Sequence, residues 1–381
     1  MTSPPIISDC LAQLAAVSAA VHRPLRFMEV CGTHTMSAFR SGLHSLLPDN
    51  VTLLSGPGCP VCVTAQEDID TLVYLAQHDD LILCTYGDML RVPGRSGTLE
   101  QARSRGADIR VVYSAIDALT LARQHPARQV VFAAVGFETT APATAAVVRL
   151  AKQQSFPNFS VLASHKRVVP AMLALLAAGA VQIDGFLCPG HVSAVIGSAV
   201  YRPIVDLYKF PCVIAGFEEI HMARALLHLA QMARDNRPEL INDYTEVVNP
   251  AGNLVAQQLL NEVFTIIDVR WRGLGVIPSS GLALRPEFHS FDAQQKFSLP
   301  VPVPRELPGC ICGQVITGIA TPHDCKSFGR SCTPVHPLGP CMVSSEGTCQ
   351  AYFKYARLGG RWSGSFQQPT PATASMQQVT P

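Results

Sequence analysis

Short apolar runs alternate with longer segments of helical periodicity along most of the chain. The apolar runs have the length and the β-branched content of strands, and they occupy residues 25–30, 51–54, 81–85, 109–113, 130–135, 159–163, 185–187 and 212–215. The segments of helical periodicity occupy residues 67–77, 115–123, 140–154, 171–178 and 220–235. Nearly continuous apolar strands separated by helices are typical of parallel sheets, so the pattern predicts an α/β fold with helices on both faces of its sheets.

Residues with reactive or charged side chains gather where these predicted strands end. Ligands of open α/β sheets bind beyond the carboxyl ends of the strands, and there the chain carries residues 31–35, 56–62, 136–140, 164–166, 189–191 and 216–219. Taken one at a time, five charged or imidazole side chains in these segments are interpreted as surface or capping residues: Glu138, Glu218, His165, Lys166 and His191. The functional site is therefore expected at the strand ends.

The composition narrows the class of protein. With 381 residues, 48% of them hydrophobic, the chain is long enough for two or three domains with cores of their own. A net charge of +1 with scattered Lys and Arg provides no basic patch for a nucleic acid. The longest apolar run, residues 168–181, contains Pro170 and Gly179 and is too short to span a bilayer. We therefore expect neither nucleic-acid binding nor membrane insertion.

The 13 cysteines of this long chain indicate metal binding or redox chemistry rather than a disulfide framework. The first residues lack the basic segment of a secretory signal, and Asp9 interrupts the apolar stretch that follows. A cytoplasmic location is therefore expected. Four cysteines lie in helical or strand patterns and are predicted to be buried as small hydrophobic residues: Cys10, Cys84, Cys188 and Cys212.

Four other cysteines near the C-terminus have the spacing of metal-cluster ligands. They are Cys325, Cys332, Cys341 and Cys349. Six, eight and seven residues separate them in a segment rich in Gly and Pro, which lets the chain fold back and bring four thiolates together. Zinc sites usually use two close CxxC turns, so the wider spacing favours an iron–sulfur cluster over structural zinc or metal-free cysteines. The nearby His323 and His336 are not needed as ligands, because four thiolates already complete the set.

Further thiols follow predicted strands or flank the four cysteines. Cys59 and Cys62 form a CxxC motif, whose sulfurs can reach each other as a disulfide or share a metal; buried core cysteines are the alternative. Cys31 and His34 are three residues apart, so the imidazole can accept the thiol proton or both can ligate one metal ion, although such a spacing is ordinarily coincidental.

One more pair of cysteines stands next to the four proposed cluster ligands. Cys310 and Cys312 are separated by a single residue. Their closeness to each other and to the four cysteines suggests a second redox pair.

Four long motifs, in this order, resemble the HypD family of scaffold proteins for the maturation of nickel-iron hydrogenases. They are MEVCGTHT at residues 28–35, GPGCPVCVT at residues 56–64, GFETTAP at residues 136–142 and CMVSSEGTC at residues 341–349. The resemblance extends from about residue 26 to residue 355, and the chain departs from it only in the tail after Arg357.

The resemblance implies two similar α/β domains and a third domain with a 4Fe-4S cluster on the four C-terminal cysteines. We place the domains at residues 1–125, 126–235 and 236–362, followed by a disordered tail at 363–381 that is rich in Ser, Gln, Pro and Thr. A Pro-rich linker at 299–308 leads into the cysteine-rich part of the third domain.

The resemblance also implies roles for the upstream thiols. Cys31, supported by His34, is expected to hold a transient iron atom together with a cysteine of a small partner, HypC. Cyanide and carbon monoxide ligands are assembled on this iron, and HypE delivers the cyanide. Cys59 and Cys62 then act as a thiol pair near the assembly site. If the cyanide arrives on a thiocyanate carrier, its transfer needs electrons, which a cluster and a thiol pair can supply.

Two other functions remain open at this point. A cluster-dependent thiol-disulfide oxidoreductase with Cys59 and Cys62 as the exchanging pair would turn over without a small scaffold partner. A zinc-stabilised interaction protein would be colourless.

Overall fold

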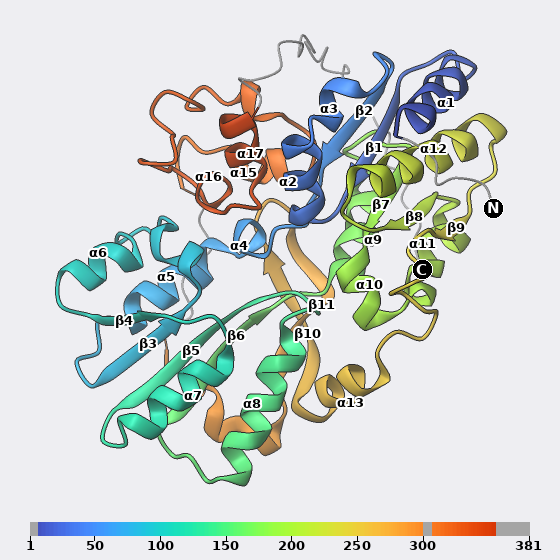
Figure 1. The fold of residues 1–381 in the computed structure, drawn as a ribbon. Helices are drawn as coiled ribbons and strands as arrows, with labels where there is room; N and C mark the ends of the chain where they lie inside the picture. The colour runs from blue at the N-terminus through green and yellow to red at the C-terminus, as the bar shows by residue number, and fades with distance from the viewer. Residues whose placement is uncertain (1–6, 300–306, 356–381) are drawn as a thin grey trace, which may run out of the picture.

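The computed structural model describes residues 7–299 and 307–355, and its parallel strands form two sheets that share one hydrophobic core (Figure 1). The first sheet has the strand order β2-β1-β7-β8-β9 and contains β1 (Leu25–Glu29), β2 (Val51–Ser55), β7 (Gly185–Pro189), β8 (Cys212–Ala215) and β9 (Leu240–Asn242). The second has the order β4-β3-β5-β6 and contains β3 (Leu81–Thr85), β4 (Asp108–Val111), β5 (Gln129–Gly136) and β6 (Phe159–His165). The predicted α/β class and all eight predicted strands are confirmed, with ends shifted by a few residues.

Helices cover both faces of each sheet. Those packed around the first sheet are α1 (Ile7–Ala19), α2 (Gly32–Arg40), α3 (Leu43–Leu46), α9 (Val168–Ala178), α10 (Gly190–Ile196), α11 (Arg202–Tyr208) and α12 (Glu219–Asp235). Those packed around the second are α5 (Gln66–Leu75), α6 (Leu99–Ser104), α7 (Ala115–Gln124) and α8 (Ala141–Gln153). Short 3-10 turns lie at η1 (Gly87–Arg91) and η2 (Ser198–Tyr201).

Neighbouring side chains along a strand pack into different hydrophobic cores. In β1, Phe27 packs with α1 and α12, whereas Met28 faces a core that continues into the second sheet. In β5, Val131 joins that same core, whereas Phe132 packs with α7 and α8 on the opposite face. Successive side chains of a strand point to opposite faces, so both sheets are buried on two sides. One hydrophobic core thus connects the two sheets with the cysteine-rich segment.

The chain passes from the first sheet to the second and back again. After β2 it crosses through the short helix α4 (Pro60–Val63), and after β6 it returns through α9. The sheets therefore do not follow the predicted boundary between residues 125 and 126, because that boundary falls between β4 and β5 of one sheet. Each sheet is assembled from strands that pair in space, irrespective of their order along the chain.

The predicted third domain, residues 236–362, is divided in its packing. Its first part contributes β9 to the first sheet. It then packs against the second sheet through α13 (Leu254–Val263) and the antiparallel ribbon of β10 (Phe264–Trp271) and β11 (Gly275–Leu284). The turn η3 (Pro286–Phe291) and the helix α14 (Ala293–Lys296) follow the ribbon.

The cysteine-rich part folds beside α2 and α4, where Figure 1 shows it in orange and red. It contains α15 (Cys312–Ile316), η4 (Pro322–Asp324), α16 (Pro340–Val343) and α17 (Thr348–Tyr355). Most of the predicted linker, 299–308, and the predicted tail, 363–381, lie outside the described residues. Within the described ranges, no helix is both long and apolar enough to cross a bilayer.

Candidate functional site

Cys31 lies where β1 gives way to α2, at the carboxyl edge of the first sheet. It is the residue that precedes the first turn of α2, and its side chain is only 2% exposed. Its sulfur receives backbone N–H groups of Thr33 and His34. Burial nevertheless raises the pKa of the thiol well above its usual value, because these two donors do not replace lost water. The thiol is therefore protonated at neutral pH, and a metal ion that binds it must displace the proton.

The imidazole that touches the Cys31 sulfur belongs to His191 rather than to His34. His191 follows β7, the neighbour of β1, and its Nε2 and Nδ1 atoms lie 3.8 and 4.0 Å from Sγ of Cys31. The Nε2–H of His34 instead donates to the carbonyl of Gly216 at 3.0 Å, and burial lowers the pKa of His34 to about 4. The ring of Phe217 lies between the two histidines, with centroids 4.8 Å from His34 and 4.9 Å from His191.

This contact corrects the interpretation of His191 as a surface or capping residue. No local signal in the sequence could have shown it, because the two residues are 160 positions apart. Its position at a strand end was the only available indication.

Two carboxyl groups flank the Cys31 backbone. Glu29 accepts a hydrogen bond from the backbone N–H of Cys31 at 2.8 Å and another from the hydroxyl of Thr35. Burial raises the pKa of Glu29 to about 7 despite these hydrogen bonds. On the other side, Thr33 donates its hydroxyl to Glu346 of the cysteine-rich part at 3.0 Å. The carboxyl groups therefore hold the α2 terminus in place and leave the thiol to face His191.

Cys59 and Cys62 form a disulfide, and their Cα atoms are 5.3 Å apart. The CxxC motif lies next to the backbone of Cys31. Gly58, which precedes Cys59, allows the two backbone segments to pack this closely because it has no side chain. A Cβ atom at this position would lie 2.1 Å from the backbone nitrogen of Cys31. The carbonyl of Gly58 also accepts the N–H of Gly32 at 3.0 Å. The CxxC motif is thus fixed against the start of α2.

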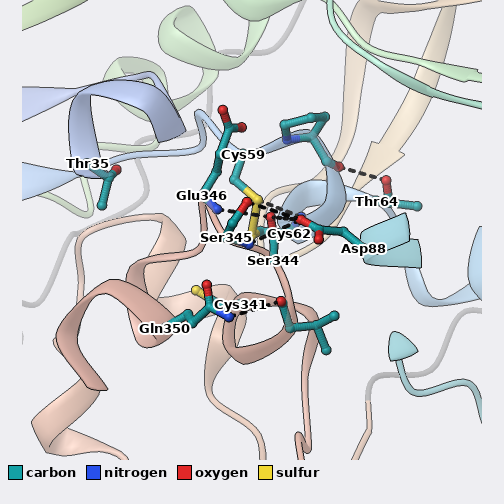
Figure 2. Close-up of a disulfide and its surroundings, with 12 residues drawn as sticks. Thr35, Cys59, Cys62, Thr64, Asp88, Cys341, Ser344, Ser345, Glu346 and Gln350 are labelled. Atoms are coloured by element: carbon teal, nitrogen blue, oxygen red, sulfur yellow. Dashed lines mark hydrogen bonds between the residues drawn. A yellow bond between two sulfur atoms is a disulfide. The ribbon is translucent and has the colours of Figure 1, made fainter. Parts of the chain in front are cut away.

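Figure 2 shows the disulfide beside the loop of Ser344, Ser345 and Glu346. The hydroxyl of Ser344 donates to Asp88 of η1 at 3.0 Å, and the backbone N–H of Ser345 donates to the same carboxylate at 3.1 Å. Because Glu346 bonds Thr33, this loop links the second sheet, the first sheet and the cysteine-rich part at one place. Helix α4, which carries Cys62, packs against α15 and α16.

All four predicted cluster cysteines line one cavity in the cysteine-rich part. Two further cysteines line it as well, so the thiols around it are Cys310, Cys312, Cys325, Cys332, Cys341 and Cys349. The other lining side chains are mostly apolar, among them Val315, Phe328 and Met342. In contrast, His323 and His336 are exposed and lie outside this lining.

Backbone N–H groups point at the sulfurs of this cavity. Cys349 donates its N–H to the sulfur of Cys341 at 3.2 Å, and Leu338 donates to the sulfur of Cys332 at 3.4 Å. Cys312 is buried, and its thiol contacts the thiols of both Cys310 and Cys341. An apolar cavity with convergent thiols and N–H donors to sulfur is suited to a thiolate-bound iron–sulfur cluster.

Residues at the strand ends of the second sheet hold neighbouring helices and the β10–β11 ribbon in place. Glu138 accepts the N–H of Val168 at 3.0 Å and so caps α9, while burial raises its pKa to about 7. Lys166 donates to the carbonyl of Arg270 at 3.1 Å and lies 3.7 Å from Asp68, which ties the ribbon to α5. Glu138 thus caps a helix, as interpreted, whereas the buried Lys166 is neither a surface nor a capping residue.

Comparison with known proteins matches nearly the whole chain to proteins of one family. The family model HypD, described as "Hydrogenase formation hypA family", matches residues 6–356. "Hydrogenase maturation factor HypD2" of Bradyrhizobium diazoefficiens is 45% identical over 356 residues, which cover 91% of this chain and 94% of the relative. "Hydrogenase maturation factor HypD" of Escherichia coli K12 is 46% identical over 354 residues, covering 92% and 94%. A "Putative hydrogenase expression/formation protein" of Methanocaldococcus jannaschii is 42% identical over 335 residues, covering 88% and 93%.

Proposed function

The chain belongs to the HypD family, and from this membership we propose that it is the scaffold on which the Fe(CN)2CO group of nickel-iron hydrogenases is assembled. The general role of a hydrogenase maturation factor follows from relatives that match nearly the whole chain. The observation that carries the finer proposal is the Cys59–Cys62 disulfide between Cys31 and the cysteine-lined cavity.

Cys31 is the ligand that holds the iron atom, shared with a cysteine of the small partner HypC. Thiolate is a soft ligand that suits low-valent iron. Its burial favours the metal-bound form over a free thiolate, because a free negative charge at this position lacks water. In this assignment His34 supports the site from behind Phe217, through its bond to Gly216.

Cyanide reaches the iron from HypE as a thiocyanate, and the Cys59–Cys62 pair supplies the two electrons. The thiocyanate S–C bond breaks, two thiols lose their protons and form the disulfide, and the products are the carrier thiol, cyanide bound to iron, and one proton. The disulfide corresponds to the oxidised end of this step.

Four cysteines, Cys325, Cys332, Cys341 and Cys349, would hold the 4Fe-4S cluster that restores the dithiol. The bound cluster would pass single electrons, so restoring the two thiols takes two electrons in turn from an external one-electron donor protein, together with two protons. Cys341 begins the chain segment that leads to Glu346, and α16 packs against α4, so the cavity adjoins the disulfide. We place this chemistry in the cytoplasm, because reduced thiols are stable there.

Infrared spectroscopy tests the scaffold role. The protein is purified anaerobically with its HypC partner from cells that also contain HypE. We expect absorption bands of iron-bound cyanide and carbon monoxide, because the ligands are assembled on the iron held between the two proteins. A complex that contains iron but shows no such bands would contradict the proposal. Reduction of protein disulfides by the chain alone would instead favour the thiol-disulfide oxidoreductase.

The Cys59–Cys62 pair is expected to be reversibly oxidised while the cluster stays bound. Thiol labelling under denaturing conditions, before and after mild reduction, should reveal two additional thiols in the native chain. Cys59→Ala and Cys62→Ala should each remove this reducible pair. Cys10→Ala, which alters a buried free cysteine on α1, should keep it. If maturation is unaffected by the loss of either cysteine, the pair is structural.

A further inference from the structure

The contact between Cys31 and His191 joins a thiol and an imidazole from adjacent strands. Cys31 follows β1 and His191 follows β7, and these strands pair in parallel with Glu29 opposite Leu187. Both side chains therefore leave the same edge of the sheet. Apart from the 3.8 and 4.0 Å contacts with Cys31, no hydrogen bond to the imidazole of His191 is found in the described part of the chain.

The surroundings of His191 do not match those of a nucleophile and its base. A base that activates a thiol is usually oriented by a third group, such as a carboxylate on its other nitrogen. The nearby carboxylate of Glu29 is instead engaged by the Cys31 N–H and by Thr35. The ring of His191 stacks on Phe217 at an interplanar angle of 29°, an apolar contact that limits its tilt without occupying its nitrogens.

A shared metal ion accounts for both side chains. Thiolate and imidazole bonds to first-row metals are about 2.3 and 2.1 Å long, which places sulfur and nitrogen about 3.6 Å apart around a tetrahedral ion and about 3.1 Å apart when the ion is six-coordinate. The observed separation is 3.8 Å. The pair is therefore spaced for the incoming ion and must close by several tenths of an ångström as the other ligands are added. Because the sulfur is nearly equidistant from both ring nitrogens, one of them must turn toward the ion, and rotation of a histidine ring about its Cβ–Cγ bond is soft.

We infer that His191 is a second ligand from this chain to the iron held by Cys31. The inference rests on the proposed function, in which Cys31 binds iron. It adds His191, so that the chain holds the iron through two side chains. Two ligands from one chain orient the ion and leave its other positions for the partner cysteine and for the diatomic ligands. Two ligands also explain why an imidazole with no other hydrogen-bond partner among the described residues lies against a buried thiol.

Cobalt(II) binding to the full-length protein under anaerobic conditions tests this assignment. Cobalt(II) shows charge-transfer and ligand-field absorption that reports thiolate and imidazole ligands. The six cysteines that line the cavity are a second place where cobalt is expected to bind. The absorption of Cys31→Ser is therefore subtracted from that of the native chain, which leaves the part that depends on Cys31. The test variants are His191→Gln and His191→Ala, and the matched control is His221→Gln, because His221 follows β8 at the same sheet edge and packs on Tyr244.

Loss of His191 is expected to weaken the Cys31-dependent binding of cobalt by at least about tenfold. Even residues that only hydrogen-bond to a metal ligand commonly contribute that much to metal affinity. The ligand-field bands should shift, and free imidazole should restore them in His191→Ala. His221→Gln should bind as the native chain does, and circular dichroism checks the fold of each variant. Unchanged affinity and bands in both His191 variants would overturn the assignment. If Cys31→Ser itself binds as the native chain does, the iron role of Cys31 fails instead.

Discussion

Replacing Cys31 by serine is expected to abolish hydrogenase maturation while the chain remains folded. Serine fits the same buried space, but its hydroxyl is a poor ligand for a soft metal. The loss should be complete, because no other thiol is in contact with His191 among the described residues. Hydrogenase activity in cells that rely on the variant as their only copy measures the effect.

The infrared bands of the complex provide a second measurement of the same change. They should vanish in Cys31→Ser and persist in Cys10→Ser, which alters a buried cysteine on α1 away from the site. Normal hydrogenase activity in cells with Cys31→Ser would show that the iron is held elsewhere.

Replacing Cys341 by alanine is expected to make the iron–sulfur cluster labile. Cys341 is buried in the cysteine-lined cavity, and its sulfur accepts the N–H of Cys349 at 3.2 Å, so the substitution removes one thiolate and leaves a donor without its acceptor. Anaerobically purified native protein should be brown, with about four iron and four sulfide per chain. The variant should lose most of both.

Iron and sulfide analysis with visible absorption measures this loss. Cys212→Ala is the control, because Cys212 is equally buried but belongs to β8 and lies outside the lining of the cavity. Zinc in place of iron and sulfide in the native protein would contradict the cluster and support the zinc-stabilised alternative.

Much of the fold could be predicted because it depends on local periodicity. The apolar runs around Phe27 and Val131 are strands that are buried on both faces, as the pattern indicated. The antiparallel ribbon of β10 and β11 was not predicted. Its strands carry exposed apolar residues such as Ile266 and Val276, so the contrast between buried and solvent-facing positions that marks an amphipathic strand is weak there.

The candidate site could be predicted in part. The CxxC spacing of Cys59 and Cys62 indicated that the two sulfurs could meet, and the structure joins them in a disulfide. The spacing of the C-terminal cysteines indicated that they converge, and they line one cavity. Cys312 was considered only as part of a separate redox pair, because its short spacing to Cys310 does not show that the chain folds it against Cys341.

By itself the sequence determined where the eight strands of the two parallel-sheet cores and several of their helices lie, which cysteines converge, and to which family the motifs are similar, because these properties depend on spacing along the chain. Only the tertiary structure decided that the chain crosses twice between two sheets and that His191, rather than His34, meets Cys31. It also decided that the disulfide lies between Cys31 and the cavity. The physical reason is that hydrophobic burial is non-directional, so the partners of a strand and of the side chains at its end are settled only when all the elements pack together.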